Sequence, residues 1–183
     1  MSWWLWPTTA DVGVRAFANS PSLLIDEVIS GMQNIVLSNS DTTFDDNLII
    51  GEIEWNHPND RSLDRLIVRI LEEVLYISEV QNRWVIKSKT MILENNIHIV
   101  FTYVDSKKIQ RDVEIKAVTR HSLEFRQIND NESIDSIDGV PEMIGPGWFA
   151  SVVFDLSWAR HRWTRVAFSN YSRFLRSGIP RHP

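Results

Sequence analysis

The sequence predicts a single layered α+β domain, with two helices and a mixed β-sheet of about six to seven strands, followed by a basic, aromatic C-terminal tail. Two stretches with apolar residues at helical spacing, and several short runs that alternate as strands do, predict the domain. The tail, positions 157–183, contains six arginines and no acidic residue. The domain, positions 1–156, contains 13 basic and 24 acidic residues, a net charge of −11. An acidic body with a basic extension is therefore expected.

The composition fits one soluble domain with a sizeable core, since 43% of the 183 residues are hydrophobic and 23% are charged. There is no cysteine, which excludes disulfides and cysteine nucleophiles and makes a cytoplasmic location the expectation. No apolar run approaches the roughly 18 residues of a membrane span. The apolar start, positions 1–6, is too short for a signal peptide and lacks its basic residues. The overall charge of −5 argues against nucleic-acid binding by the whole surface.

Strands and helices are expected to alternate in the first half of the chain. Ser20 is a suitable helix cap, and Pro21 suits the first helical position after it. A second apolar stripe at helical spacing runs from Leu63 to Leu75. The expected order is a strand at 12–18, a helix at 21–37, a loop at 38–47, a strand at 48–55 and a helix at 63–77.

The second half is expected to contain strands only. A turn at 94–96 separates two runs that form a hairpin, and residues 128–147, rich in Asp, Asn, Ser, Gly and Pro, are expected to form a loop. The expected strands are 84–93, 97–104, 113–119, 122–127 and 148–156.

Two carboxylates, Asp11 and Asp155, stand in otherwise apolar segments at opposite ends of the domain. Asp11 precedes the first expected strand, and Asp155 lies near the end of the last one. Two carboxylates that met in a folded protein would repel each other unless a cation or a shared proton lay between them. Taken alone, each residue is more often an ordinary turn or strand-end residue.

Four short segments, in this order, resemble the archease family. They are Thr8-Thr9-Ala10-Asp11, Leu71-Glu72-Glu73-Val74-Leu75-Tyr76, Lys116-Ala117-Val118-Thr119-Arg120-His121 and Val152-Val153-Phe154-Asp155-Leu156. The resemblance covers roughly residues 3–156. The main departure is Thr8, where the family usually has histidine.

The resemblance implies an accessory protein without catalysis of its own. Archeases assist the tRNA-splicing ligase that joins a 2′,3′-cyclic-phosphate or 3′-phosphate RNA end to a 5′-hydroxyl end. They promote guanylylation of that ligase and sustain its multiple turnover. The expected partner is thus a 3′-phosphate RNA ligase, with RNA contact weak or indirect.

The resemblance also implies a divalent-metal site, for Ca, Mg or Mn, with calcium suggested by the family. Carried over, its ligands are Asp11, Asp155 and the carbonyl of Leu156, oxygen donors of the kind that hard cations prefer. Functional neighbours expected from the motifs are Glu73, Lys116 and His121. Without the family, Glu73 is an ordinary solvated helix residue and Lys116 an exposed strand lysine.

The tail leaves alternatives open. Its basic residues alternate with aromatic ones around Arg160, Arg162 and Arg165, as in segments that contact RNA. The same residues suit docking on the acidic body, binding of a partner or contact with a membrane surface. The competing functions are an RNA-binding module that uses this tail and a metal-dependent hydrolase built on the aspartates. No catalytic residues are assigned, because no nucleophile elbow, phosphate-binding loop or dinucleotide fingerprint is present.

Overall fold

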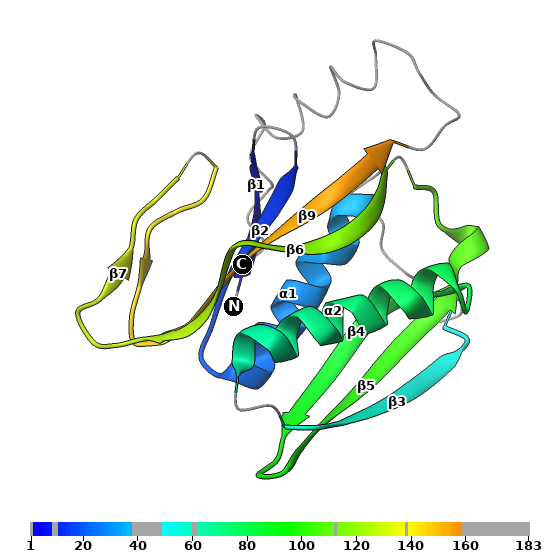
Figure 1. Cartoon of the computed structure of the whole chain (residues 1–183), viewed down its shortest axis with the longest axis horizontal. Helices are drawn as coiled ribbons and strands as arrows, with labels where there is room; N and C mark the ends of the chain where they lie inside the picture. Colours follow the sequence, from blue (N-terminus) through cyan, green and yellow to red (C-terminus); the bar gives the residue numbers. More distant parts are fainter. Residues whose placement is uncertain are drawn as a thin grey trace.

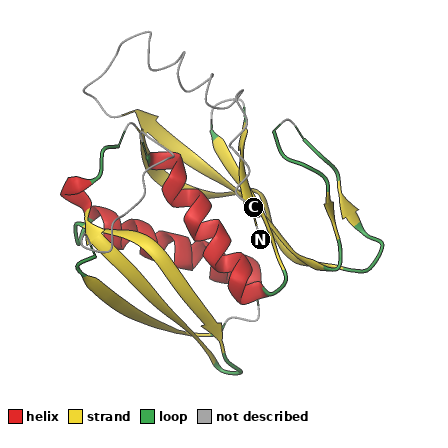
Figure 2. Cartoon of the chain, turned by 180° about the vertical axis from the view of Figure 1, so that it is seen from behind, coloured by secondary structure: helices red, strands yellow, loops and turns green. Residues whose placement is uncertain are grey.

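The computed structural model describes residues 2–8, 11–37, 49–59, 62–111, 113–137 and 139–158. Two helices lie between a four-stranded and a three-stranded sheet, and a long β-arm extends from the larger sheet (Figures 1 and 2). The expected α+β class is confirmed. Every strand pairing in the described residues is antiparallel, so the single mixed sheet is replaced by separate antiparallel sheets.

The larger sheet joins the two ends of the domain. Its strand order is β1-β2-β9-β6, which places the last strand beside the N-terminal hairpin. The apolar N-terminal segment, for which no strand was predicted, forms the edge strand β1. The strands are β1 (Ser2–Pro7), β2 (Val12–Ala18), β6 (Val113–Ile128) and β9 (Gly147–Trp158).

The smaller sheet has the order β3-β5-β4 and packs on the other side of the helices (Figure 2). Its middle and last strands form the predicted hairpin. Exposed side chains alternate with less exposed ones along β3, which explains its strand pattern in the sequence. The strands are β3 (Gly51–Pro58), β4 (Arg83–Ile92) and β5 (Asn96–Asp105).

Both helices begin close to the predicted residues. Helix α1 (Pro21–Val36) is capped by Ser20, whose hydroxyl accepts a hydrogen bond from the backbone N–H of Leu23 at 3.3 Å. Helix α2 (Leu63–Glu79) presents its apolar stripe to the core. A short 3₁₀ helix, Ser106–Lys108, follows β5. None of the helices described is long and apolar enough to cross a membrane.

Two polar contacts tie α1 to the smaller sheet. The carboxylate of Asp26 accepts hydrogen bonds from the Ser88 hydroxyl at 2.7 Å, and from the Thr90 hydroxyl and backbone N–H at 2.7 and 3.2 Å. The side chain of Gln33 donates to the carbonyl of Val85 at 3.0 Å. These bonds fix the helix against β4 within an otherwise apolar core.

Most of the stretch 128–147, predicted to be a loop, forms a β-arm with a small core of its own, described at residues 129–137 and 139–146. The arm contains the short pair β7 (Ser133–Ile134) and β8 (Met143–Ile144). It folds over the face of the larger sheet that is turned away from the helices, and the cluster beneath it is separate from the main core. The buried members of this arm cluster are Ile128, Val140, Met143 and Phe149, and the side chains packed on them are Trp4, Trp6, Phe17, Ile134 and Ile137.

The two strands predicted at 113–119 and 122–127 are one strand, β6, with two irregularities. One lies between Ile115 and Ala117, and the other between Thr119 and Glu124. At the second, Ser122 adopts a positive φ of 53°, which is uncommon for a residue other than glycine. The local break in alternation explains why the sequence suggested two strands.

Candidate functional site

Asp11 ends the turn that joins β1 to β2. The backbone N–H of Thr8 donates to the carbonyl of Asp11 at 3.1 Å, and the N–H of Asp11 donates to the Thr8 hydroxyl at 3.0 Å. Thr8 therefore helps to hold this turn. Its hydroxyl fixes the backbone that carries the Asp11 carboxylate.

The register of the larger sheet brings Asp11 to Asp155. Val12 in β2 pairs with Phe154 in β9, so Asp11 and Asp155 occupy the next position along the two adjacent strands. Val12 and Phe154 are buried against the helices. Since side chains alternate along a strand, Asp155 belongs to the opposite face. The half-buried Asp11 and Asp155 thus lie side by side at one end of the sheet.

Lys116 lies at the same end, on the other side of β9. Ile115 pairs with Leu156 and Ala117 with Asp155, so Lys116 is the extra residue of a bulge opposite the Asp155–Leu156 step. Its side chain is exposed. A bulge re-aims one side chain relative to a regular strand, and here that side chain is a lysine on the strand next to Asp155, although no ion pair among the described residues joins it to either aspartate. We call Asp11, Asp155, Leu156 and Lys116 the sheet-end site.

Two of the expected neighbours are placed elsewhere. His121 is exposed in the second irregularity of β6, where residues 120–123 stand opposite Val152 alone. Glu73 is half-buried on α2, in the helical layer, and no hydrogen bond or ion pair among the described residues joins it to Asp155 or Lys116. The predicted contact residues Arg160, Arg162 and Arg165 lie outside the described residues.

The donor set is suited to a hard cation only if backbone or partner oxygens complete it. Within the described ranges, no three His, Asp or Glu side chains gather closely enough to hold a metal ion. Two carboxylates and the Leu156 carbonyl would supply three oxygens, and Ca²⁺ takes six to eight. Water or groups of a partner molecule would therefore make up most of the shell.

One residue near the site was missed by sequence reasoning. The indole of Trp6 lies close against Gly13: a Cβ at that glycine would stand 2.2 Å from Trp6 Nε1. Gly13 is two residues from Asp11, so the ring covers the sheet next to the site. A lone glycine in a strand was the available signal, because it marks a close approach by another group.

Comparison with known proteins identifies the family of the chain. A sequence model described as the Archease protein family (MTH1598/TM1083) matches residues 3–156. The chain belongs to the archease family. The match includes the β1–β2 turn, both irregularities of β6 and the end of β9 up to Leu156, so the sheet-end site lies wholly within it. Comparison with curated protein sequences found no match.

Solved archease structures share the fold. The solution structure of Methanobacterium thermoautotrophicum protein 1598 aligns with a TM-score of 0.55 and 18% identity, covering 84% of this chain and 98% of that one. An archease from Thermotoga maritima, described as a possible chaperone, aligns with a TM-score of 0.50 and 20% identity, covering 81% and 92%. At these identities the likeness shows the fold alone.

Proposed function

We propose that this archease activates a 3′-phosphate RNA ligase of tRNA splicing or RNA repair, by promoting its guanylylation and multiple turnover. The observation that carries the proposal is the register that sets Asp11 beside Asp155 at an end of the sheet, in a chain of the archease family. The protein would act as an accessory factor without catalysis of its own.

In this proposal Asp11, Asp155 and the Leu156 carbonyl hold a divalent cation, with calcium the first candidate and magnesium or manganese the others. Such a cation would neutralise the two carboxylates and leave coordination positions for oxygens of a partner. Lys116 would balance the carboxylate charge when no cation is bound and would be free to contact phosphate in the complex. His121 and Glu73 are proposed as partner contacts on neighbouring surfaces of the same domain.

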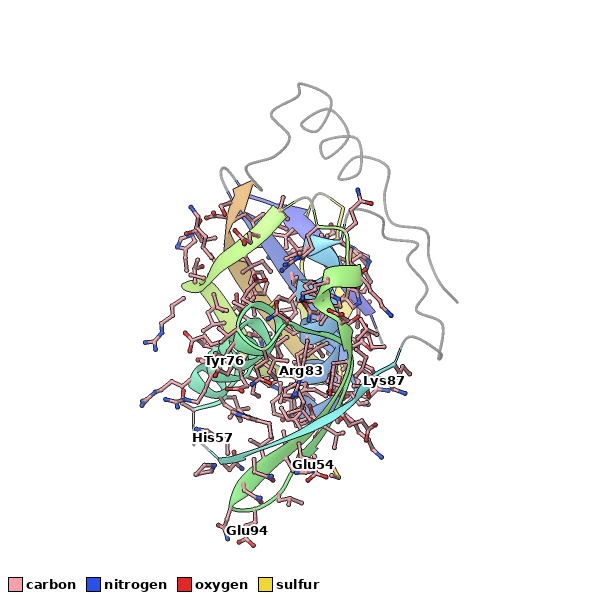
Figure 3. The ribbon with its side chains drawn as sticks, turned by 90° about the vertical axis from the view of Figure 1, so that its right-hand side faces the viewer. Glu54, His57, Tyr76, Arg83, Lys87 and Glu94 are labelled. Atoms are coloured by element: carbon pink, nitrogen blue, oxygen red, sulfur yellow. The ribbon has the colours of Figure 1, made fainter. Side chains whose placement is uncertain are left out.

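The test is guanylylation of a 3′-phosphate RNA ligase from the same source, measured with GTP and each divalent metal. The wild-type protein is compared with Asp11→Asn and Asp155→Asn, which keep side-chain size and remove one charge. The matched control is Glu94→Gln, an exposed residue in the β4–β5 turn of the other sheet (Figure 3).

Stimulation by the wild type and by Glu94→Gln, but not by either Asp variant, would support the proposal. Equal stimulation by all four proteins would refute the assigned site. If no protein stimulated the ligase, the activator role itself would be wrong. Turnover of RNA or nucleotide by the isolated protein with metal would favour the hydrolase alternative instead.

A further inference from the structure

The arm of residues 129–146 has an outward face that nothing in the described structure covers. Ser133 pairs with Ile144, and Ile134 pairs with Met143. Met143 is buried in the arm cluster and Ile134 packs against it, so the Ser133–Ile144 pair faces outward. Ile144 is 65% exposed, the highest value among the exposed large hydrophobic residues described. An apolar side chain thus stands at the centre of an unpartnered sheet face.

Two unpaired carboxylates flank Ile144 on that face. Asp135 and Glu142 are the next residues along the two strands after the Ile134–Met143 pair, so they stand opposite each other and share the outward face with Ile144. Both are exposed, and neither forms an ion pair with a described residue. Like charges directly opposite each other are destabilising, so this arrangement favours a cation between them.

The arm contains no basic residue of its own to neutralise this negative charge. Residues 129–146 contain five acidic residues and no lysine or arginine. Glu132 is already engaged, because the Asn129 N–H and the Arg126 guanidinium lower its pKa, and Arg126 lies 2.5 Å away. Asp130 is exposed at the turn before β7. The outward face therefore combines an apolar centre with a strongly anionic rim, and its best occupant carries both guanidinium and aromatic groups.

The face is held in place before any occupant arrives. The guanidinium of Arg15 donates to the carbonyl of Asp135 at 3.3 Å and lies over the ring of Phe149, at 5.7 Å from its centroid. A docking segment therefore does not have to order the arm, which lowers the entropic cost of association.

We propose that the arginine-rich C-terminal segment of this chain, residues 159–183, docks on the outward face of the arm. The segment contains six arginines, the aromatic residues Trp163, Phe168, Tyr171 and Phe174, and no acidic residue. Its charge and composition match the rim and the apolar centre of the face.

The segment is also long enough. It leaves the sheet at Trp158, while Arg15, which contacts the arm, pairs with Ser151. The arm contact is thus seven residues back along β9, roughly 23 Å at the rise of a strand. A 25-residue segment spans up to about 80 Å when extended, so it reaches the arm with length to spare.

RNA is the competing binding partner of the segment, and the segment cannot bind the arm and RNA at the same time. RNA phosphates carry the same sign of charge as the arm, so arginines bound to Asp135 and Glu142 are not available to RNA. Docking on the arm therefore keeps the basic segment away from RNA unless a stronger polyanion displaces it. This inference concerns a surface separate from the sheet-end site and does not depend on ligase activation.

The chain has no cysteine, so docking is testable in the full-length protein by paired cysteines. The test pairs combine Ser133→Cys, next to Ile144 on the outward face, with Thr164→Cys, Ser169→Cys or Ser172→Cys, so that both carboxylates and all six arginines are kept. Matched controls combine Glu94→Cys, at the exposed β4–β5 turn, with the same three substitutions (Figure 3). The rate of intramolecular disulfide formation is measured in dilute protein at low salt and at about 1 M salt, where charges are screened beyond ~3 Å.

We expect at least one arm pair to close about tenfold faster than its control at low salt, with the difference lost at high salt. Equal rates for arm and control pairs would overturn the proposal. Disulfides formed only between two molecules would also overturn it, because they would place the segment on a second copy. If the rates are equally slow and added single-stranded RNA protects residues 159–183 from cleavage by trypsin, the segment binds RNA instead.

A second measurement avoids cysteine altogether. Trypsin cleaves after arginine, so the rate of cleavage within residues 159–183 reports how well the segment is protected. The variant Asp135→Asn/Glu142→Gln is compared with Glu54→Gln/Glu94→Gln, which removes two exposed charges from the other sheet. We expect cleavage to be several-fold faster only in the arm variant, since two ion pairs are lost there. Unchanged cleavage in both variants would refute docking through these carboxylates.

Discussion

The guanidinium of Arg15 lies over the indole ring of Trp6, with the two groups 5.5 Å apart. The Arg15 side chain also reaches the ring of Phe149 and the carbonyl of Asp135, so one residue of β2 contacts β1, β9 and the arm. Burial lowers the pKa of Arg15, and the charge of Glu124 opposes this effect. Arg15 is therefore a central contact between the arm and the larger sheet.

Arg15→Lys is expected to loosen the arm without unfolding the domain. Lysine keeps the charge but loses the planar group that stacks on both rings. Loss of about 1 kcal/mol of stacking predicts roughly fivefold faster amide exchange in residues 129–137 and 139–146. Hydrogen exchange measured by mass spectrometry checks this, with α1 as the internal reference.

The matched control is Arg83→Lys. Arg83 lies over the ring of Tyr103 at 4.9 Å in the smaller sheet, far from the arm in the strand order. Arg83→Lys should leave amide exchange in the arm unchanged. Faster exchange in the arm of both variants, or of neither, would contradict the role assigned to Arg15.

Gly13→Ala is expected to destabilise the domain, because the new methyl group would stand 2.2 Å from Trp6 Nε1 and 2.3 Å from Cε2. The indole ring must move away from the sheet, at a cost of about 1–3 kcal/mol. Urea unfolding followed by tryptophan fluorescence measures it. Gly51→Ala is the control, since its nearest neighbour is the Tyr103 hydroxyl at 3.2 Å. An equally large loss of unfolding free energy in Gly51→Ala would refute the explanation by the close contact with Trp6.

Asp26→Ala is expected to cost about 2–4 kcal/mol of unfolding free energy, because it leaves the partly buried hydroxyls of Ser88 and Thr90 without their acceptor. A double-mutant cycle with Thr90→Val isolates the contact. We expect a coupling energy of about 1–2 kcal/mol between the two positions. Additive losses would show that the contact contributes nothing beyond the separate residues.

Glu27→Gln is expected to stabilise the protein at neutral pH. Burial, and then the neighbouring charge of Asp26, raise the pKa of Glu27 above its ordinary value. The folded state thus binds the proton more tightly than the unfolded state, so Glu27 reduces stability as pH rises from the unfolded pKa through the folded one. The variant should melt at a higher temperature at pH 7, by no more than about 3 °C because the side chain is half-exposed.

Well below the unfolded pKa the glutamate is protonated in both states, so the difference between variant and wild type should vanish at about pH 3. Thermal melting across this pH range provides the check. An equal difference at both pH values would show that packing, not the charge of Glu27, causes the effect.

The helices and most strands were predictable because their helix caps and apolar periodicity agree with the way the elements pack in the fold. Strand β2 was predicted with the bounds it has, Val12–Ala18, and α1 begins at Pro21 as its cap indicated. Strand β1 was missed because it is covered on both faces. Trp3 packs against the main core, whereas Trp4 and Trp6 pack against the arm cluster. An edge strand covered in this way is apolar throughout and shows no alternation.

The arm and the geometry of the site depend on contacts between distant residues. Strands of two residues, as in β7 and β8, are too short to leave a pattern in a segment with a loop-like composition. Asp11 and Asp155 could be named from the family motifs, but their adjacency follows from the register of β2 on β9. The bulge that presents Lys116 lies in the separate pairing of β6 with β9, so no local signal in the sequence predicts it.

Thr8→Val is expected to weaken ligase stimulation although valine is close to threonine in size. The change removes the hydroxyl that accepts the Asp11 N–H, at a cost of about 1 kcal/mol, and frees the backbone that carries the carboxylate. Thr8→Ser keeps the acceptor and should stimulate as the wild type does. Guanylylation measured over a range of divalent-metal concentrations separates positioning of Asp11 from a direct contact of the Thr8 hydroxyl with the ligase.

If Thr8 acts by positioning Asp11, Thr8→Val will need more metal for half-maximal stimulation yet reach a similar maximum. A lower maximum at saturating metal would instead indicate a contact of the hydroxyl with the ligase. Equal curves for Thr8→Val and Thr8→Ser would show that the turn holds Asp11 through the Thr8 N–H and the Asp11 carbonyl alone, a bond 3.1 Å long that both variants retain. The hydroxyl of Thr8 would then be dispensable for the position of Asp11.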